Sequence, residues 1–251
     1  MNRYLLLYVC MPFVVCAGSY THTTQMPEPS VPNIAVIELY DGVVLKMDGA
    51  SKKNAIVHSD AVNMIVQDGV LTLSASKNAH SSDYVVYYNT QDHFKHVKEI
   101  RIYDSASLEA KSTNAPYILR NESSESSKID GYVPLIFLEN KGQGSLSIDW
   151  VSSQDVDARI YHGNVHLAGV AKRARYRIDN KATLDARHLR VDDMWALGQG
   201  QSMSFLMPVR QSHCVVTGNA QLLLENKPYY YSTLVSGKGE IIYNNLFALS
   251  P

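Results

Sequence analysis

The chain has little cysteine and almost no net charge. Only Cys10, Cys16 and Cys214 occur among 251 residues, and lysine and arginine nearly balance aspartate and glutamate, giving a formal net charge of −1. A near-neutral balance argues against a nucleic-acid binder that relies on phosphate neutralisation. Cys10 lies in an apolar leader and Cys16 at its end. Cys214 would then stand alone, which excludes a disulfide framework in the rest of the chain.

Helical periodicity is also missing after residue 33. Tyrosine is common (16) and tryptophan rare (2), and apolar runs are short and separated by Gly, Asn, Asp and Ser, which favours strands joined by turns. The predicted strands in the first half include 34–39, 43–47, 62–66, 70–73, 84–88 and 100–103.

The one long apolar run lies at the start, from Tyr4 to Val15 after Arg3. About twelve apolar residues are too few to span a bilayer but suit a signal peptide. Val15-Cys16-Ala17 allows ordinary cleavage before Gly18. Phe13-Val14-Val15-Cys16 instead resembles a lipobox, with cleavage before Cys16 and a lipid on its thiol. We expect a signal peptide over 1–16, lipidation of Cys16 and a flexible tether over 17–33, which is rich in Ser, Thr and Pro.

A five-residue cassette recurs after residue 100, with a turn residue first and an apolar residue last. It covers 104–108, 142–146, 163–167, 180–184, 200–205 in a weaker form, 218–222 and 237–241. The apolar ends are separated by 38, 21, 17, 21, 17 and 19 residues, so the period is close to 19. One copy is missing near residue 127, where the polar stretch Asn121–Lys128 is predicted to form an exposed loop that leaves the repeat.

A 19-residue period predicts an all-β solenoid, in which each coil buries an apolar row by stacking on the next. Gly or Asn recurs because each coil bends sharply. We expect Leu167, Leu184 and Leu222 to be buried in one longitudinal row. The alternative is a β-sandwich with turns that recur by coincidence.

The order of these motifs resembles the putative auto-transporter adhesin, head GIN domain family. The resemblance runs from about Ile34 to Ile242. It includes Ile56–Asp60 and Val66–Leu73 early in the chain, and later 163–167, 184–189, 216–220 and 237–241. It implies a right-handed β-solenoid over 34–251, with a subdivision near 100–130, and no established enzymatic activity. The polar stretch 121–128 and Tyr229-Tyr230-Tyr231 depart from the family pattern.

No catalytic, metal or cofactor site is predicted. The sequence around Cys214 predicts the interior of a strand. His213 beside it would point to the opposite face of that strand, so this histidine is poorly placed to activate the thiol. The histidine pairs His93/His96 and His162/His166 lack a helix or a third ligand to form a zinc site. The acidic pairs Asp155/Asp157 and Asp192/Asp193 carry no acid–base motif.

One charged feature supports a sharper hypothesis. Arg173, Arg175 and Arg177 alternate and therefore share one strand face, which Arg159, Arg187 and Arg190 could extend. They could form a docking face for an anionic partner such as lipopolysaccharide, peptidoglycan or an acidic protein. Alternatively, Asp155, Asp157, Asp192 and Asp193 on neighbouring coils neutralise the row across the strands.

These observations favour a non-catalytic protein of the bacterial cell envelope. We expect it to be lipid-anchored on the periplasmic face of the outer membrane, as a subunit of an envelope assembly or secretion complex. A soluble periplasmic or secreted form is the alternative location. The second functional reading is an adhesin-like binder of surface polysaccharide or peptidoglycan, and the third is a polysaccharide-acting enzyme.

Overall fold

A computed structural model describes residues 34–48, 55–57, 61–76, 85–89, 97–111 and 117–244. The predicted signal peptide and tether, with Cys16, lie outside these residues, as do His93 and His96. All regular elements in the described part are β-strands, which confirms the all-β prediction. They are β1 (Val36–Leu39), β2 (Val44–Asp48), β3 (Ala55–Val57), β4 (Val62–Gln67), β5 (Val70–Ala75), β6 (Val85–Asn89), β7 (Glu99–Ile102), β8 (Ser107–Lys111), β9 (Ile118–Asn121), β10 (Ser127–Val133), β11 (Phe137–Asn140), β12 (Ser145–Ile160), β13 (Asn164–Ile178), β14 (Thr183–Gly198), β15 (Met203–Gly218), β16 (Gln221–Leu224), β17 (Tyr230–Gly237) and β18 (Glu240–Tyr243).

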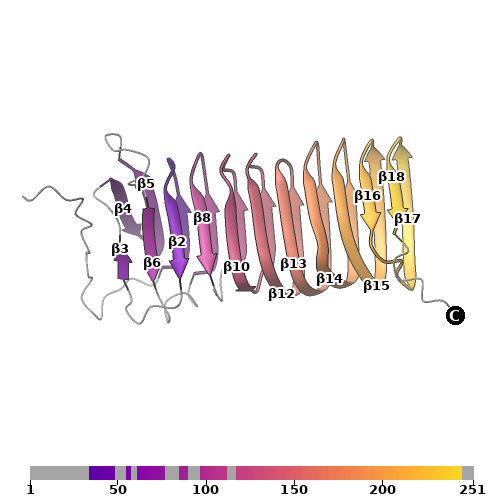
Figure 1. Cartoon of the computed structure of the whole chain (residues 1–251), viewed down its shortest axis with the longest axis horizontal. Coiled ribbons are helices and arrows are strands. Elements are labelled where there is room, and N and C mark those ends of the chain that lie inside the picture. Colours follow the sequence, from indigo (N-terminus) through magenta and orange to yellow (C-terminus); the bar gives the residue numbers. More distant parts are fainter. Residues whose placement is uncertain are drawn as a thin grey trace, which may run out of the picture.

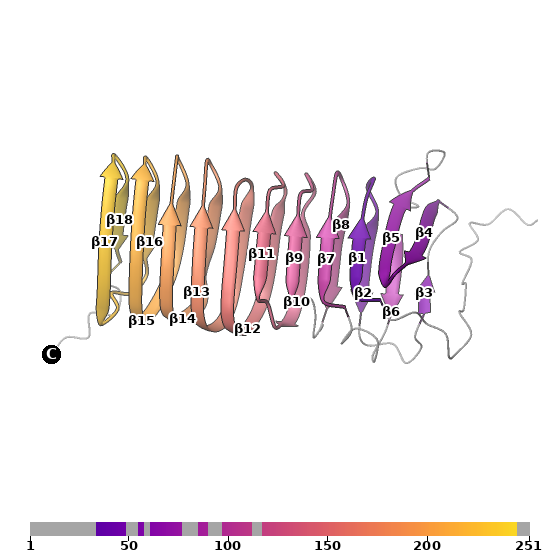
Figure 2. The ribbon, with the colours of Figure 1, turned by 180° about the vertical axis from the view of Figure 1, so that it is seen from behind.

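The strands stack as a β-solenoid with two long parallel sheets. The first sheet holds β5, β1, β7, β9, β11, the second halves of β12 to β15, and β17 (Figure 2). The second sheet holds β6, β2, β8, β10, the first halves of β12 to β15, β16 and β18 (Figure 1). Each coil runs from the first sheet through a tight turn to the second, then bends back.

The predicted 19-residue period is confirmed by the strand register. One inward-facing position of the second sheet is occupied in successive coils by Leu108, Ser127, Leu146, Val165, Leu184, Ser204, Leu222 and Ile241. Neighbours in this row are 18 to 20 residues apart in the chain. The hand of the coiling stays a prediction.

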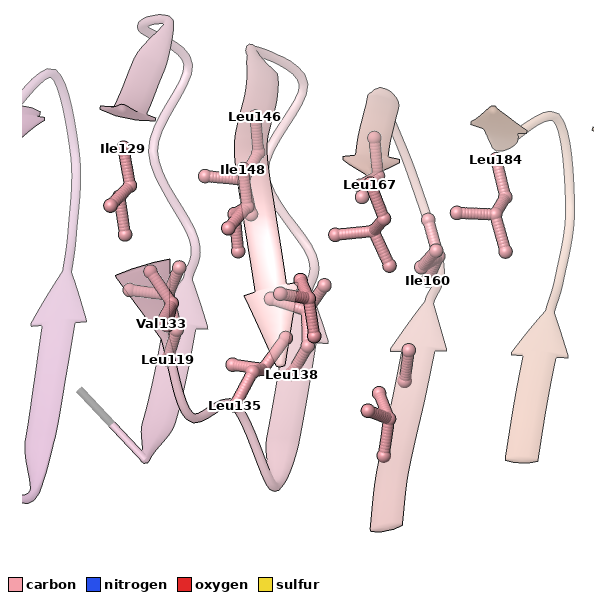
Figure 3. Close-up of a cluster of buried hydrophobic side chains, with 14 of the residues drawn as sticks. Leu119, Ile129, Val133, Leu135, Leu138, Leu146, Ile148, Ile160, Leu167 and Leu184 are labelled. Carbon is pink, nitrogen blue, oxygen red and sulfur yellow. The ribbon is translucent and has the colours of Figure 1, made fainter. Parts of the chain in front are cut away.

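The predicted row of Leu167, Leu184 and Leu222 is wrong in one member. All three side chains are buried, but Val165 is the residue in register with Leu184, and Leu167 lies opposite Ile148 in the adjacent row. Figure 3 shows Ile148, Leu167 and Leu184 in the space between the two sheets. The first pair of 21- and 17-residue spacings arose because Leu167 lies two residues beyond the true repeat position, which Val165 holds. The second pair arose because Phe205 lies one residue beyond Ser204, which holds that position in its coil.

The prediction that Asn121–Lys128 leaves the repeat is also wrong. This stretch completes β9, makes the tight turn and begins β10. Asn121, Ser123 and Ser127 are buried, and the Ser127 hydroxyl accepts a hydrogen bond from the Leu108 amide at 3.1 Å. Asn121 and Ser123 likewise bond to the neighbouring coils, through Asn140 and the Ala106 carbonyl. Short polar side chains can therefore fill this coil without leaving buried groups unpaired. Both sheets therefore run without a break from β7 to β10.

The turns explain the recurring Gly and Asn. Asn180 has φ of 57° and Gly163 has φ of 69°, in the left-handed region that these two residue types tolerate best. A Cβ on Gly163 would also lie 2.6 Å from the carbonyl oxygen of Gly142 in the preceding coil. Close stacking of backbone on backbone thus fixes glycine at that turn.

The first coils do not stack in chain order. β1 lies between β5 and β7 (Figure 2), and β2 lies between β6 and β8. Beyond β5, the strand β4 pairs antiparallel, with Val62 buried and Met64 and Val66 packed against the core. An antiparallel strand therefore covers the core at this end. Within the described residues, no helix is long and apolar enough to cross a membrane.

Candidate functional site

The predicted arginines do not share one face. Arg159, Arg175 and Arg177 point outward from the first sheet, and Arg173 lies where β13 bends into that sheet. Arg187 instead lies on the outer face of the second sheet, with its guanidinium 4.6 Å from the centre of the Phe205 ring. The fold separates Arg187 because each long strand contributes its two halves to different sheets.

Arg190 lies between these faces, near the bend of β14, and forms no ion pair with a described residue.

Aspartates pair with the arginines along the first sheet. Asp155 lies opposite Arg173 on the neighbouring coil, with one oxygen 2.5 Å from Nε and the other 2.8 Å from Nη2. This hydrogen-bonded pair lowers the pKa of Asp155. Arg175 lies opposite Asp157, at a longer 3.8 Å.

Three other arginines pair with an aspartate two residues away in the chain. Arg159 lies 3.4 Å from Asp157, Arg177 3.0 Å from Asp179, and Arg187 2.7 Å from Asp185. The pairs of Asp155 and Asp157 across the strands follow the second interpretation of the sequence. The pairs along the chain were not predicted, and Asp193 binds Arg210 instead of the row.

A shallow hollow opens beside Arg173 and Arg175 on the first sheet; we call it the Trp195 hollow. Its volume is about 620 Å³, and it crosses coils β11 to β15. Trp195 lies half-buried in it, flanked in register by Arg175 on one side and His213 on the other. The remaining lining residues are Ile136, Asp155, Val156, Asp157, Arg173, Ala174, Asp193, Met194 and Gln211.

A second hollow continues around the bend; we call it the Tyr132 hollow. It shares Ile136 and Asp155 with the first hollow and adds the exposed side chains Tyr132 and Val170. Its polar lining residues are Ser152, Ser153, Gln154, Lys172, Arg190 and Asp192. Ile136, 52% exposed, lies between the two hollows and makes them one continuous surface.

Trp150 extends the apolar part of this surface. It lies in register with Tyr132 on the next coil and is 54% exposed. Exposed aromatic side chains next to charged groups are typical of ligand-binding surfaces, because rings supply rigid apolar contact area and charges supply directed hydrogen bonds.

The charges around the two hollows balance. Four carboxylates and four basic side chains line them, namely Asp155, Asp157, Asp192, Asp193, Lys172, Arg173, Arg175 and Arg190. Asp193 binds Arg210 through one oxygen, while its other oxygen, Oδ1, is buried without a partner among the described residues. The surface therefore offers donors and acceptors without an excess of positive charge.

The structure also places the cysteine and histidines for which the sequence predicts no catalytic or metal-binding role. Cys214 is buried in the first sheet, and burial raises its pKa to about 11. His213 points to the outer face, where its ring nitrogens lie 2.6 Å from Gln211 Nε2 and Ser232 Oγ. His162 lies in a turn and His166 on β13. Within the described ranges, no group of three or more His, Cys, Asp or Glu side chains is placed to hold a metal ion.

Sequence reasoning identified Arg173, Arg175 and Arg190 but missed the aromatic part of this surface. Alternation could have placed Trp195 outward, since Met194 and Ala196 on either side of it are buried. Nothing in the sequence brings Tyr132 next to Trp150, because their pairing follows a shift in register inside β10 and β12.

Several crystal structures are similar to the chain, among them those of two putative adhesins and a putative lipid binding protein. One is a putative adhesin from Bacteroides fragilis NCTC 9343, with TM-score 0.58 and 18% identity, covering 85% of this chain and 93% of that one. Another is a putative adhesin from Parabacteroides merdae ATCC 43184, with TM-score 0.67, 17% identity and coverage of 85% and 92%. The third is a putative lipid binding protein from Parabacteroides distasonis ATCC 8503, with TM-score 0.69, 12% identity and coverage of 84% and 92%. At these identities the likeness shows the fold alone.

No protein of curated function matches the chain. A family match does, and it covers residues 35–228, which is most of the solenoid. Together with the two-sheet solenoid, this match shows that the chain belongs to the family described as "Putative auto-transporter adhesin, head GIN domain".

Proposed function

We propose that the protein is a non-catalytic, adhesin-like binding protein that recognises a neutral surface polysaccharide in the Trp195 and Tyr132 hollows. The observation that carries the proposal is the continuous surface in which Trp195, Ile136 and Tyr132 alternate with Asp–Arg pairs. A sugar ring offers one apolar face for aromatic stacking and a rim of hydroxyls for carboxylate and guanidinium groups.

The charge balance favours a neutral ligand. An anionic glycan would gain attraction from Arg173 and Arg175 but would meet Asp155, Asp157 and Asp193 beside them. Neutral hydroxyls use both signs of charge as hydrogen-bond partners. The names of the family and of two structural neighbours also support adhesion rather than a subunit of a secretion complex.

A glycan array tests the proposal, with purified wild-type protein and two pairs of matched variants. Arg175→Ala removes an exposed guanidinium from the hollow, whereas Arg177→Ala removes one from the same face outside it. Trp195→Ala removes the ring, whereas Tyr87→Ala removes an exposed ring near the other end of the stack.

We expect the hollow variants to weaken binding of a glycan by about tenfold or more, which is about 1.4 kcal/mol, and the two controls to bind normally. Circular dichroism checks that each variant is folded. Failure of the wild-type protein to bind any neutral glycan would contradict the proposal. Photocrosslinking from position 195 in cells would then test the envelope-complex alternative.

The proposal includes the lipid anchor expected on Cys16. A lipid on Cys16 would hold the binding surface at the outer membrane, because two or three acyl chains give stable attachment. Cys16→Ser should release the protein into the periplasm with its solenoid intact. Wild-type protein that takes up no labelled palmitate would refute the anchor without affecting the binding proposal.

A further inference from the structure

The last coil of the described solenoid, formed by β17 and β18, leaves its outer edge exposed; we call it the open end (Figure 1). β17 pairs with β15 on one side, and β18 pairs with β16. No other described strand pairs with either of them. All eight residues of β17 are exposed. Its free backbone groups therefore form a template on which another strand could pair.

The inward-facing side chains of β17 continue rows that are buried in the preceding coil. Val235 is in register with the buried Val216, and Thr233 with the buried Cys214. Val235 thus continues an apolar row of the core, yet it is 47% exposed. Leu234 beside it is 62% exposed on the outer face. The core ends here without a covering layer among the described residues.

The opposite end differs. There the antiparallel strand β4 buries Val62 and packs Met64 and Val66 against the core. Solenoids need a terminal covering element, because an uncovered coil exposes both apolar side chains and strand edges. Among the described residues, the fold thus covers one end of the core and leaves the other uncovered.

We infer that the open end binds the open end of a second copy, giving a two-fold, end-to-end dimer with antiparallel β17 strands at its centre. β17 contains no charged residue, so the two β17 strands meet without like-charge repulsion between opposed side chains. A two-fold axis brings the same patch of both copies together, which a self-complementary strand allows.

The size of the open end fits a dimer of modest stability. It comprises about 15 residues from 229 to 243. At about 32 Å² per residue, the average implied by a standard interface, each copy would bury about 500 Å² and the pair about 1,000 Å². That total is near the lower limit for a specific interface, so we expect dissociation in the micromolar range.

Sedimentation of the full chain, exported with Cys16→Ser to keep it free of lipid, tests the inference. Wild-type protein should shift from monomer to dimer as its concentration rises. Leu234→Lys places a charge on the exposed edge without disturbing a buried contact, and should raise the dimer dissociation constant about tenfold or more, equivalent to about 1.4 kcal/mol. Ile65→Lys is the matched control, because Ile65 is 59% exposed on β4 at the opposite end.

Hydrogen exchange adds a second measurement. The amides of β17 should exchange more slowly at high protein concentration in the wild type and in Ile65→Lys, but not in Leu234→Lys. A wild-type chain that stays monomeric up to about 1 mM, roughly 1,000-fold above a dissociation constant of about 1 μM, would overturn the inference. So would dissociation by Ile65→Lys, which would indicate head-to-tail contact. Trp195→Ala should leave dimerisation unchanged, which separates this test from that of glycan binding.

Discussion

The side-chain amide of Asn121 donates a hydrogen bond to the side-chain oxygen of Asn140 at 2.7 Å, one 19-residue repeat away, and both residues are fully buried. Asn140 in turn donates to the carbonyl oxygen of His162 at 2.6 Å. Stacked asparagines thus bind three successive coils together at the edge where the chain turns.

Asn121→Ala should lower the free energy of unfolding by about 1–3 kcal/mol, because it leaves the Asn140 oxygen buried without its donor. Urea unfolding followed by circular dichroism measures the change. Asn164→Ala, at an exposed position of β13, is the control and should stay within about 0.5 kcal/mol of the wild type. Equal effects of the two substitutions would contradict a structural role for the asparagine stack.

Tyr176→Phe should leave stability unchanged or raise it by about 1 kcal/mol. The Tyr176 ring is 1% exposed and its hydroxyl has no partner among the described residues, and burial raises its pKa. Removing an unsatisfied buried hydroxyl removes a desolvation cost, whereas Tyr176→Ala should cost about 3–5 kcal/mol by analogy with other aromatic truncations. A clear loss of thermal stability in Tyr176→Phe would show that the hydroxyl is bonded after all.

Glu99 should make the fold sensitive to acid. Burial alone would raise its pKa, but hydrogen bonds from Arg101 and Arg120, at 2.8 and 2.9 Å, outweigh burial and hold the pKa below its ordinary value. A carboxylate with a lowered pKa stabilises the fold above its unfolded pKa, and this contribution is lost as the pH falls through the folded value.

Glu99→Gln should therefore destabilise the protein at pH 7 and have a smaller effect near pH 3. Thermal melts of both proteins across pH 3–7 measure the difference. Glu125→Gln, which changes an exposed carboxylate in a turn, provides the control. A pH-independent gap between Glu99→Gln and the wild type would contradict the linkage.

Cys214 should resist alkylation in the folded protein. Because burial raises its pKa to about 11, only about 0.1% of the thiol is ionised at pH 8, and thiolate is the reactive form. The measurement uses a chain with Cys10→Ser and Cys16→Ser, so that Cys214 is the sole thiol. Labelling should be slow in buffer and fast in guanidinium, and rapid labelling of the native protein would show that this coil opens readily.

The repeat could be predicted from the sequence because turn residues and apolar residues recur at a near-constant distance. The residues that form one buried row could not be predicted, because the same inward-facing position holds Ser127 and Ser204 as well as Leu184. A buried serine that bonds to a backbone amide has no apolar signature. The polar composition of 121–128 therefore suggested a loop where the structure has a regular coil.

The candidate surface was predictable in its charges and not in its shape. Alternation placed Arg173 and Arg175 outward together, as the structure has them. The hollows depend on where the long strands bend, and register shifts between Ile148 and Val151 mark those bends. Such shifts leave no pattern in the sequence, and neither does the insertion of β1 between two later strands.

That insertion has a mechanical consequence. The chain enters the solenoid through β1, which is held on both sides: Ala35 donates to Gly69 at 2.8 Å, and Lys98 donates to Ala35 at 2.8 Å. Tension applied through the segment before Ile34 would have to shear the hydrogen bonds to β5 and β7 together, whereas a strand at the end of the stack could peel away one bond at a time. Load applied at the amino end would thus enter the stack at a strand that is paired on both sides, and the fold would resist extraction of that strand.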